Sequence, residues 1–138
     1  EGALMGIPAV AISLAMMGEK ATYYRTAADF TLKFCRKLFR KEIPAGALFN
    51  INVPNVKSSE LQGWEVTRLG KRNYGDVIVE KTDPRGRLYY WIGGDQESFY
   101  QIKNSDCMAV EAKKVSITPL KTDLSDRPYM KKLNEWLS

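Results

Sequence analysis

The pattern that most constrains the fold is a strand, a helix and a second strand in succession. Residues 8–14 form a nearly continuous apolar run containing Val10 and Ile12, which is typical of a strand buried on both faces. A buried helix is the competing interpretation of this run. Residues 22–42 carry apolar side chains at helical spacing, and residues 48–53 are again strand-like. The order predicts an α/β fold in which a right-handed crossover joins two parallel strands. The helical positions are Ala27, Phe30, Thr31, Phe34, Cys35 and Leu38.

The division that we predict places the end of an α/β core in residues 1–56 and a β-rich extension in residues 57–138. A hairpin over about 77–92 turns at Asp83-Pro84-Arg85-Gly86, because proline presets the turn and glycine closes it. A strand over 115–120 and a terminal helix over about 127–137 follow. A two-stranded ribbon is marginally stable alone, so the hairpin must rest on the parent domain or on another subunit.

The composition excludes several classes of protein. The chain of 138 residues is 44% hydrophobic and 27% charged, which excludes disorder, and its net charge of +5 favours anionic ligands without requiring one. Histidine is absent, so a nucleophile activated by histidine is excluded. The carboxylates are scattered without an adjacent pair, and we interpret them as solvated or turn-forming residues. No phosphate-binding glycine loop is present.

The two cysteines and the longest apolar run indicate the cellular compartment that we expect. Cys35 and Cys107 lie far apart without metal-ligand spacing. We expect reduced core thiols in a cytoplasmic protein, while a disulfide between them remains open. Residues 7–17 are too few to span a bilayer, so no membrane partner is expected. The chain begins with Glu1, and residues 1–6 resemble the last turn of a helix, which suggests a cut chain.

Two polar features indicate possible binding surfaces. Asn50 and Asn52 fall on one face of a predicted inner strand, where asparagine is disfavoured. They face either a ligand cleft or neighbouring loop backbone. The alternative function is a small basic module that binds nucleic acid through a basic and aromatic middle segment, although packing or subunit contact explains the same residues better. That segment contains Trp64, Arg68, Lys71, Arg72 and Tyr74.

Several segments resemble motifs of the survival protein E (SurE) nucleotidases. They are residues 1–14 (EG…G-F/I-PA-L/I-A-V/I-S in the family), 48–54 (LNINVP), 66–70 (VTR-x-G), 83–94 (the DPRG hairpin) and 105–120 (TD…VSITPL). The matches occur in the family's order across nearly the whole chain. The departures are local, with Cys107 where the family often has an aromatic residue and Lys113 where it often has glycine. A left-handed backbone at Lys113 would cost about 1 kcal/mol.

The resemblance implies a fold and an activity. It implies a Rossmann-like, three-layer α/β core with a C-terminal hairpin extension and a terminal helix. It also implies a metal-dependent 5′-nucleotidase, a phosphoric monoester hydrolase that cleaves nucleoside 5′- and 3′-monophosphates and in some members polyphosphate. The Mg²⁺ or Mn²⁺ ligands of the family precede the segment that Glu1 matches. We therefore assign no catalytic or metal residue to this chain, which we expect to be the C-terminal part and inactive alone.

The resemblance also implies assembly into a homodimer or homotetramer through the extension and the final helix. The interface that we expect contains Tyr89, Tyr90, Trp91, Tyr129, Leu133 and Trp136. The preferred nucleotide, the metal and the subunit number stay open.

Overall fold

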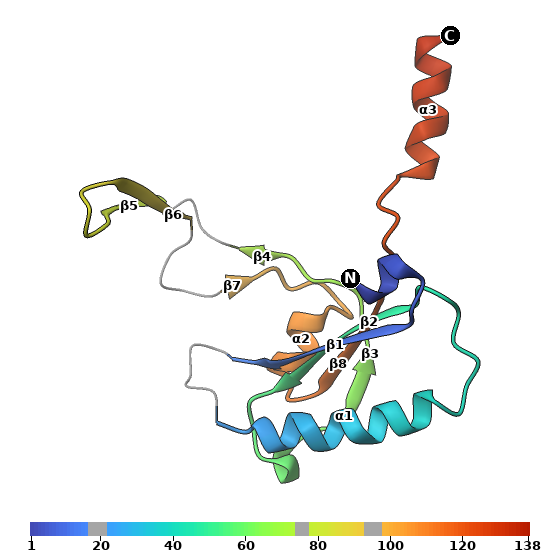
Figure 1. Cartoon of the computed structure of the whole chain (residues 1–138), viewed down its shortest axis with the longest axis vertical. Coiled ribbons are helices and arrows are strands. Elements are labelled where there is room, and N and C mark those ends of the chain that lie inside the picture. Colours follow the sequence, from blue (N-terminus) through green and yellow to red (C-terminus); the bar gives the residue numbers. More distant parts are fainter. Residues whose placement is uncertain (17–21, 74–77, 93–97) are drawn as a thin grey trace.

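The computed structural model describes residues 1–16, 22–73, 78–92 and 98–138. Figure 1 shows a small sheet with helices against it and two projecting elements. In chain order the elements are η1 (Gly2–Met5), β1 (Ala9–Ala15), α1 (Tyr24–Leu38), β2 (Leu48–Pro54), η2 (Ser58–Glu60), β3 (Trp64–Val66), β4 (Arg72–Asn73), β5 (Ile78–Thr82), β6 (Leu88–Ile92), β7 (Ser98–Phe99), α2 (Asp106–Glu111), β8 (Val115–Leu120) and α3 (Arg127–Leu137).

The main sheet has the strand order β1-β2-β8-β3. Strands β1 and β2 are parallel, from Ala9 opposite Leu48 to Ala15 opposite Pro54, and α1 connects them. This confirms the predicted α/β crossover unit and excludes the buried-helix interpretation of residues 8–14. Strand β8 runs antiparallel to β2 and parallel to β3. The main sheet is therefore mixed.

The hydrophobic core lies between α1 and one face of the sheet. Its buried members are Ala27, Ile51, Val53, Val115 and Ile117, with Val10, Ile12, Leu14, Phe30, Phe34 and Leu61 packed against them. Alternate residues of each strand point to this face, as the period of a strand requires. The helix is shorter than the predicted span of residues 22–42, because the chain turns after Leu38.

The opposite face of the main sheet carries small and polar side chains. Ser13, Asn52 and Ser116 lie next to one another across β1, β2 and β8. The buried hydroxyls of Thr67 and Thr118 are hydrogen-bonded at 2.7 Å. Helix α2 packs against β8 and β2 with Ala109 and Val110 buried. A sheet face of this kind accommodates polar ligands better than an apolar layer would.

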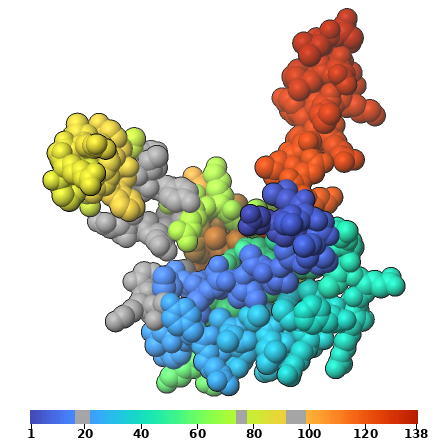
Figure 2. Space-filling model, in the orientation of Figure 1, coloured from blue at the N-terminus to red at the C-terminus, as the bar shows by residue number. Residues whose placement is uncertain are grey.

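The hairpin β5–β6 and helix α3 stand away from the body of the molecule (Figures 1 and 2). The side chain of Asp83 accepts hydrogen bonds from the backbone N–H groups of Arg85 and Arg87 at 2.8 and 2.9 Å, which closes the predicted turn. Asp126 caps α3 by accepting from the N–H of Tyr129 at 3.0 Å. The elements expected at about 77–92, 115–120 and 127–137 are present, although residue 77 lies outside the described residues.

The boundary at residue 56 stays a prediction. Strands β3 and β8 follow that boundary in the sequence, yet they lie in the same sheet as β1 and β2. The main sheet therefore draws residues from both predicted parts.

Candidate functional site

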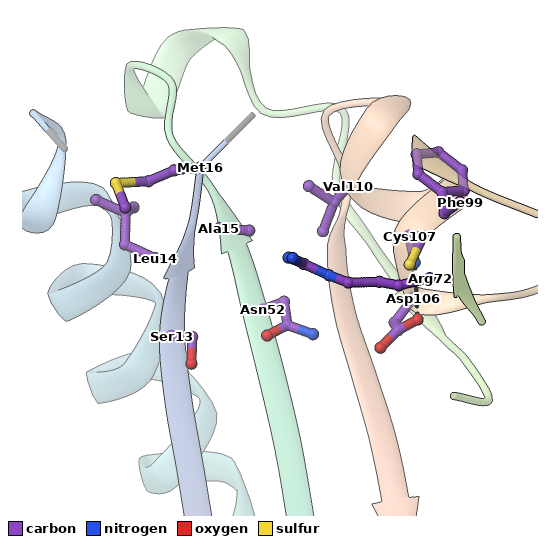
Figure 3. Close-up of a pocket in the computed structure, with 10 residues that line it drawn as sticks. All are labelled: Ser13, Leu14, Ala15, Met16, Asn52, Arg72, Phe99, Asp106, Cys107 and Val110. Carbon is purple, nitrogen blue, oxygen red and sulfur yellow. Dashed lines mark hydrogen bonds between the residues drawn. The ribbon is translucent and has the colours of Figure 1, made fainter. Parts of the chain in front are cut away.

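A pocket of about 390 Å³ lies beside the carboxyl ends of β1 and β2. Open α/β sheets bind ligands outside the carboxyl ends of their strands, so this is the position where a site is expected. Figure 3 shows its lining side chains, which come from both strands, from β4, β7 and α2, and from the residue after β1. They are Ser13, Leu14, Ala15, Met16, Asn52, Arg72, Phe99, Asp106, Cys107 and Val110.

The sheet contributes the neutral polar groups of the pocket. Ser13 and Asn52 are partners across β1 and β2, and Asn52 is in turn opposite Ser116 of β8. The Ser116 hydroxyl is fully buried and has no hydrogen-bond partner among the described residues. A hydroxyl and an amide at one strand end can both donate hydrogen bonds to an anionic ligand.

Arg72 contributes the positive charge of the pocket. It lies on the short strand β4, where it is paired with Phe99 of β7. In Figure 3 the Arg72 side chain extends from β4 toward β1 and β2, on the side of the sheet where Asn52 lies. The Arg72 side chain is exposed, so a ligand entering from solvent can reach it.

Asp106 fixes the segment that leads to Arg72. One carboxylate oxygen, Oδ1, accepts from the N–H of Gly70 at 2.7 Å and from the N–H of Cys107 at 2.8 Å. A Cβ atom added to Gly70 would lie 2.8 Å from both Oδ1 of Asp106 and Sγ of Cys107, so only glycine fits this approach. The N–H of Asp106 also donates to the carbonyl of Arg68 at 3.0 Å. These bonds hold the start of α2 against the chain before β4.

Cys107 keeps its proton at neutral pH. Burial raises the pKa of its thiol, and the negative charge and hydrogen bond of Asp106 raise this pKa further, while the positive charge of Arg72 opposes them. The thiol therefore lines the pocket without adding a charge to it.

The described residues do not form a complete site for a divalent cation. Among them, no group of three or more histidine, cysteine, aspartate or glutamate side chains is gathered where it could hold an ion. Asp106 is the one carboxylate among the ten lining residues. A Mg²⁺ or Mn²⁺ ion needs several oxygen ligands at one point, so these residues do not fit such an ion by themselves. What they can do is bind and orient an anion.

The asparagines predicted to face a cleft lie at different depths along β2. Asn52 lines the pocket. Asn50 is two residues earlier on the same face, half-buried between Ala11 of β1 and Thr118 of β8, and it is not among the pocket lining. A cleft-facing role for both stays a prediction.

The six residues predicted for a subunit interface are exposed and lie away from the pocket. They are on β6 and α3, the elements that project from the body (Figure 2). On α3, the rings of Tyr129 and Trp136 contact each other edge to face with centroids 5.8 Å apart. Their role in assembly stays a prediction.

Sequence reasoning did not select Arg72, Ser13 or Asp106 as site residues. Arg72 falls within the basic and aromatic middle segment, whose Tyr74 lies outside the described residues. The one local signal was Gly70 followed by two basic residues, which is common in loops. The pocket joins residues 36 positions apart through the bond between Gly70 and Asp106, and no local pattern encodes that bond.

A family model described as "Survival protein SurE" matches residues 1–76, more than half of the chain. The chain belongs to the SurE family. Relatives named "5'-nucleotidase SurE" are 43% identical over 136 residues in Geobacter sulfurreducens and 40% identical over 138 residues in Moorella thermoacetica. These alignments cover 99% and 100% of this chain and 52% of each relative. The chain spans about half the length of the curated relatives it matches.

A solved structure has the same fold. The crystal structure of SurE protein from Aquifex aeolicus matches with a TM-score of 0.78 and 29% sequence identity, covering 99% of this chain and 54% of that chain. These comparisons confirm the family resemblance and the α/β fold. They do not favour the alternative of a nucleic-acid-binding module. In the part of the chain that the structure describes, no helix is both long enough and apolar enough to cross a membrane.

Proposed function

We propose that this SurE-family chain forms part of a 5′-nucleotidase that hydrolyses nucleoside monophosphates to nucleoside and phosphate. The single observation that carries the proposal is that relatives named "5'-nucleotidase SurE" match the chain over 99–100% of its length. A pocket with donor groups and a positive charge beside the strand ends supports it, because phosphate esters are anions. Nucleoside 3′-monophosphates and polyphosphate are the further substrates that the family resemblance implies.

Within such an enzyme, the residues of this chain bind and orient the substrate. Ser13, Asn52 and Arg72 present hydrogen-bond donors to the pocket, and Asp106 holds the segment that carries Arg72. A divalent cation, Mg²⁺ or Mn²⁺, would supply the charge that activates water and polarises the phosphoryl oxygens. The described residues do not fit that ion alone, so we place its ligands in the part of the relatives that this chain does not match.

The projecting elements would hold subunits together. Helix α3 leaves every one of its residues exposed, including Leu133, Trp136 and Leu137. Exposed apolar surface of this kind is typical of an interface between subunits. We therefore propose a homodimer or homotetramer in which α3 and the β5–β6 hairpin contact another copy. A cytoplasmic location is the further proposal that the family resemblance implies.

The test joins this chain to the preceding half of the Geobacter sulfurreducens relative, with the intact relative as positive control. Phosphate release is measured from AMP, 3′-AMP and polyphosphate with Mg²⁺ or Mn²⁺. We expect release by the chimera and none by the 138-residue chain alone. A folded, inactive chimera would count against the nucleotidase function, and release by the chain alone would contradict its role as a scaffold.

A further inference from the structure

The pocket at the strand ends combines one cation with neutral donors and an apolar wall. Arg72 enters it from β4, while Ser13 and Asn52 face it from the sheet (Figure 3). Ala15, Phe99 and Val110 supply apolar surface to this pocket, whereas Leu14 packs into the core on the other face of the sheet. Because the Arg72 side chain is exposed, water screens its charge, and the neighbouring neutral donors must contribute to binding an anion.

The position of Arg72 is determined on both sides of β4. Arg72 pairs with Phe99, and the N–H of Tyr100 donates to the carbonyl of Lys71 at 3.0 Å. On the other side, Asp106 binds the N–H of Gly70 at 2.7 Å. The backbone that carries Arg72 is therefore attached to β7 and to α2, which fixes where its side chain starts.

The negative charge of Asp106 is partly compensated within the protein. Its Oδ1 atom accepts two backbone N–H groups, from Gly70 and Cys107. Hydrogen bonds to a carboxylate stabilise its charge and reduce the repulsion that a second anion would meet. Since Cys107 remains a neutral thiol, Asp106 is the only source of negative charge among the lining residues.

The chemistry of these groups selects one class of anion. A guanidinium has five N–H donors in a planar arrangement that matches two oxygens of a phosphate. The amide of Asn52 and the hydroxyl of Ser13 add neutral donors for its other oxygens. The volume of about 390 Å³ lies in the range of small-molecule pockets, and Phe99 offers a ring surface for the organic part of a phosphate ester.

We propose that Arg72, with Ser13 and Asn52, binds the phosphate group of a phosphate monoester in this pocket. The assignment of that ester as a nucleoside monophosphate rests on the proposed function. Arg72 is then a specificity-determining residue, because it distinguishes a phosphorylated ligand from the same molecule without phosphate. Arg72, Ser13 and Asn52 all belong to this chain, so the test uses the 138-residue chain without added metal.

The test is titration of the isotope-labelled chain with inorganic phosphate, AMP and adenosine. The NMR signals observed are the Asn52 side-chain amide and the Arg72 Nε–H. We expect saturable shifts with phosphate and AMP. The dissociation constant for adenosine should be at least about tenfold higher than that for AMP. Equal affinity for adenosine and AMP, or no shift at millimolar phosphate, would overturn the proposal.

Two substitutions that each remove one positive charge distinguish binding in the pocket from a general effect of net charge. Arg72→Gln should weaken AMP binding about tenfold or more, whereas Arg85→Gln, in the hairpin turn, should leave it unchanged. Arg72→Lys keeps the charge and should give an intermediate loss, which keeps the test valid if Arg72→Gln fails to fold. An equal loss in Arg72→Gln and Arg85→Gln would overturn the proposal.

The two hypotheses fail in different ways. If the chimera releases phosphate from AMP but Arg72→Gln changes neither its KM nor the AMP titration, the role of Arg72 is wrong and the nucleotidase function stands. If the titration depends on Arg72 but the chimera hydrolyses nothing, phosphate binding stands and the nucleotidase function is wrong. A rise in KM with kcat nearly constant is the kinetic result expected for a binding residue.

Discussion

Lys113 adopts a left-handed backbone conformation, with a φ of 57°. It follows α2, and its N–H donates to the carbonyl of Val110 while the N–H of Lys114 donates to the carbonyl of Ala109. This pair of bonds is the Schellman motif, which places a left-handed residue just after the end of a helix. Glycine suits that position because it has no Cβ, so a lysine there is under strain. Lys113 departs from the motif that this segment resembles, in which glycine is common, and the positive φ explains why glycine suits the position.

Replacing Lys113 by glycine is expected to raise the free energy of unfolding by about 1 kcal/mol. The gain from removing the strained Cβ exceeds the entropy that glycine adds to the unfolded chain. Urea denaturation measures this change in stability. The control is Lys121→Gly, at an exposed position without a positive φ. If both variants lose stability equally, the strain at Lys113 is negligible.

The Cys107 thiol predicts a pH dependence of stability. Its pKa is raised from the ordinary value of 9.0, first by burial and then by Asp106. The folded state therefore holds this proton more tightly than the unfolded state. The resulting stabilisation is fully present below pH 9.0 and is lost as the pH rises through the folded-state pKa. Wild type should thus lose more stability than Cys107→Ser between about pH 8 and about pH 10, measured by urea denaturation. Equal losses would contradict the raised pKa.

At the scale of elements, the α1–β1–β2 unit carries the core. Ile51 is fully buried in β2, and the ring of Phe34 from α1 contacts Phe49 edge to face with centroids 6.0 Å apart. The helix places its apolar face on the sheet because its side chains repeat at helical spacing. The periodicity in the sequence was therefore sufficient to predict these elements and their packing faces.

Truncation of Ile51 to alanine is expected to lower the free energy of unfolding by about 2–5 kcal/mol, because it leaves a cavity in the closed part of the core. Leu32→Ala on α1 is the matched control, since Leu32 is 50% exposed. Its cost should be about 1 kcal/mol or less. Chemical denaturation of both variants measures the difference in the free energy of unfolding. Similar losses would contradict the position of Ile51 in the hydrophobic core.

At the scale of the whole molecule, α3 and the hairpin expose large apolar side chains among the described residues. Trp136 and Trp91 are 63% and 59% exposed. Apolar surface left in water lowers solubility, and contact with a second copy would bury it. This surface is the physical basis of the proposed assembly.

The double substitution Leu133→Ala with Trp136→Ala is expected to shift the protein toward monomer in analytical ultracentrifugation. The control is Lys131→Ala with Glu135→Ala, which alters α3 without changing the net charge or its apolar stripe. The control should sediment as wild type. An unchanged sedimentation coefficient of the Leu133/Trp136 variant would exclude α3 from the subunit contact.

The sequence by itself determined the β1–α1–β2 unit, the β5–β6 hairpin and its turn, strand β8, helix α3 and the family. These features depend on local spacing and short motifs, such as the apolar period of α1 and Asp83-Pro84-Arg85-Gly86. Only the tertiary structure decided that β8 lies between β2 and β3, and that Arg72 and Asp106 share a pocket with Ser13 and Asn52. Both depend on pairing between distant segments. Because many registers and neighbours are compatible with the same local pattern, the choice among them is made by the free energy of the whole packed chain.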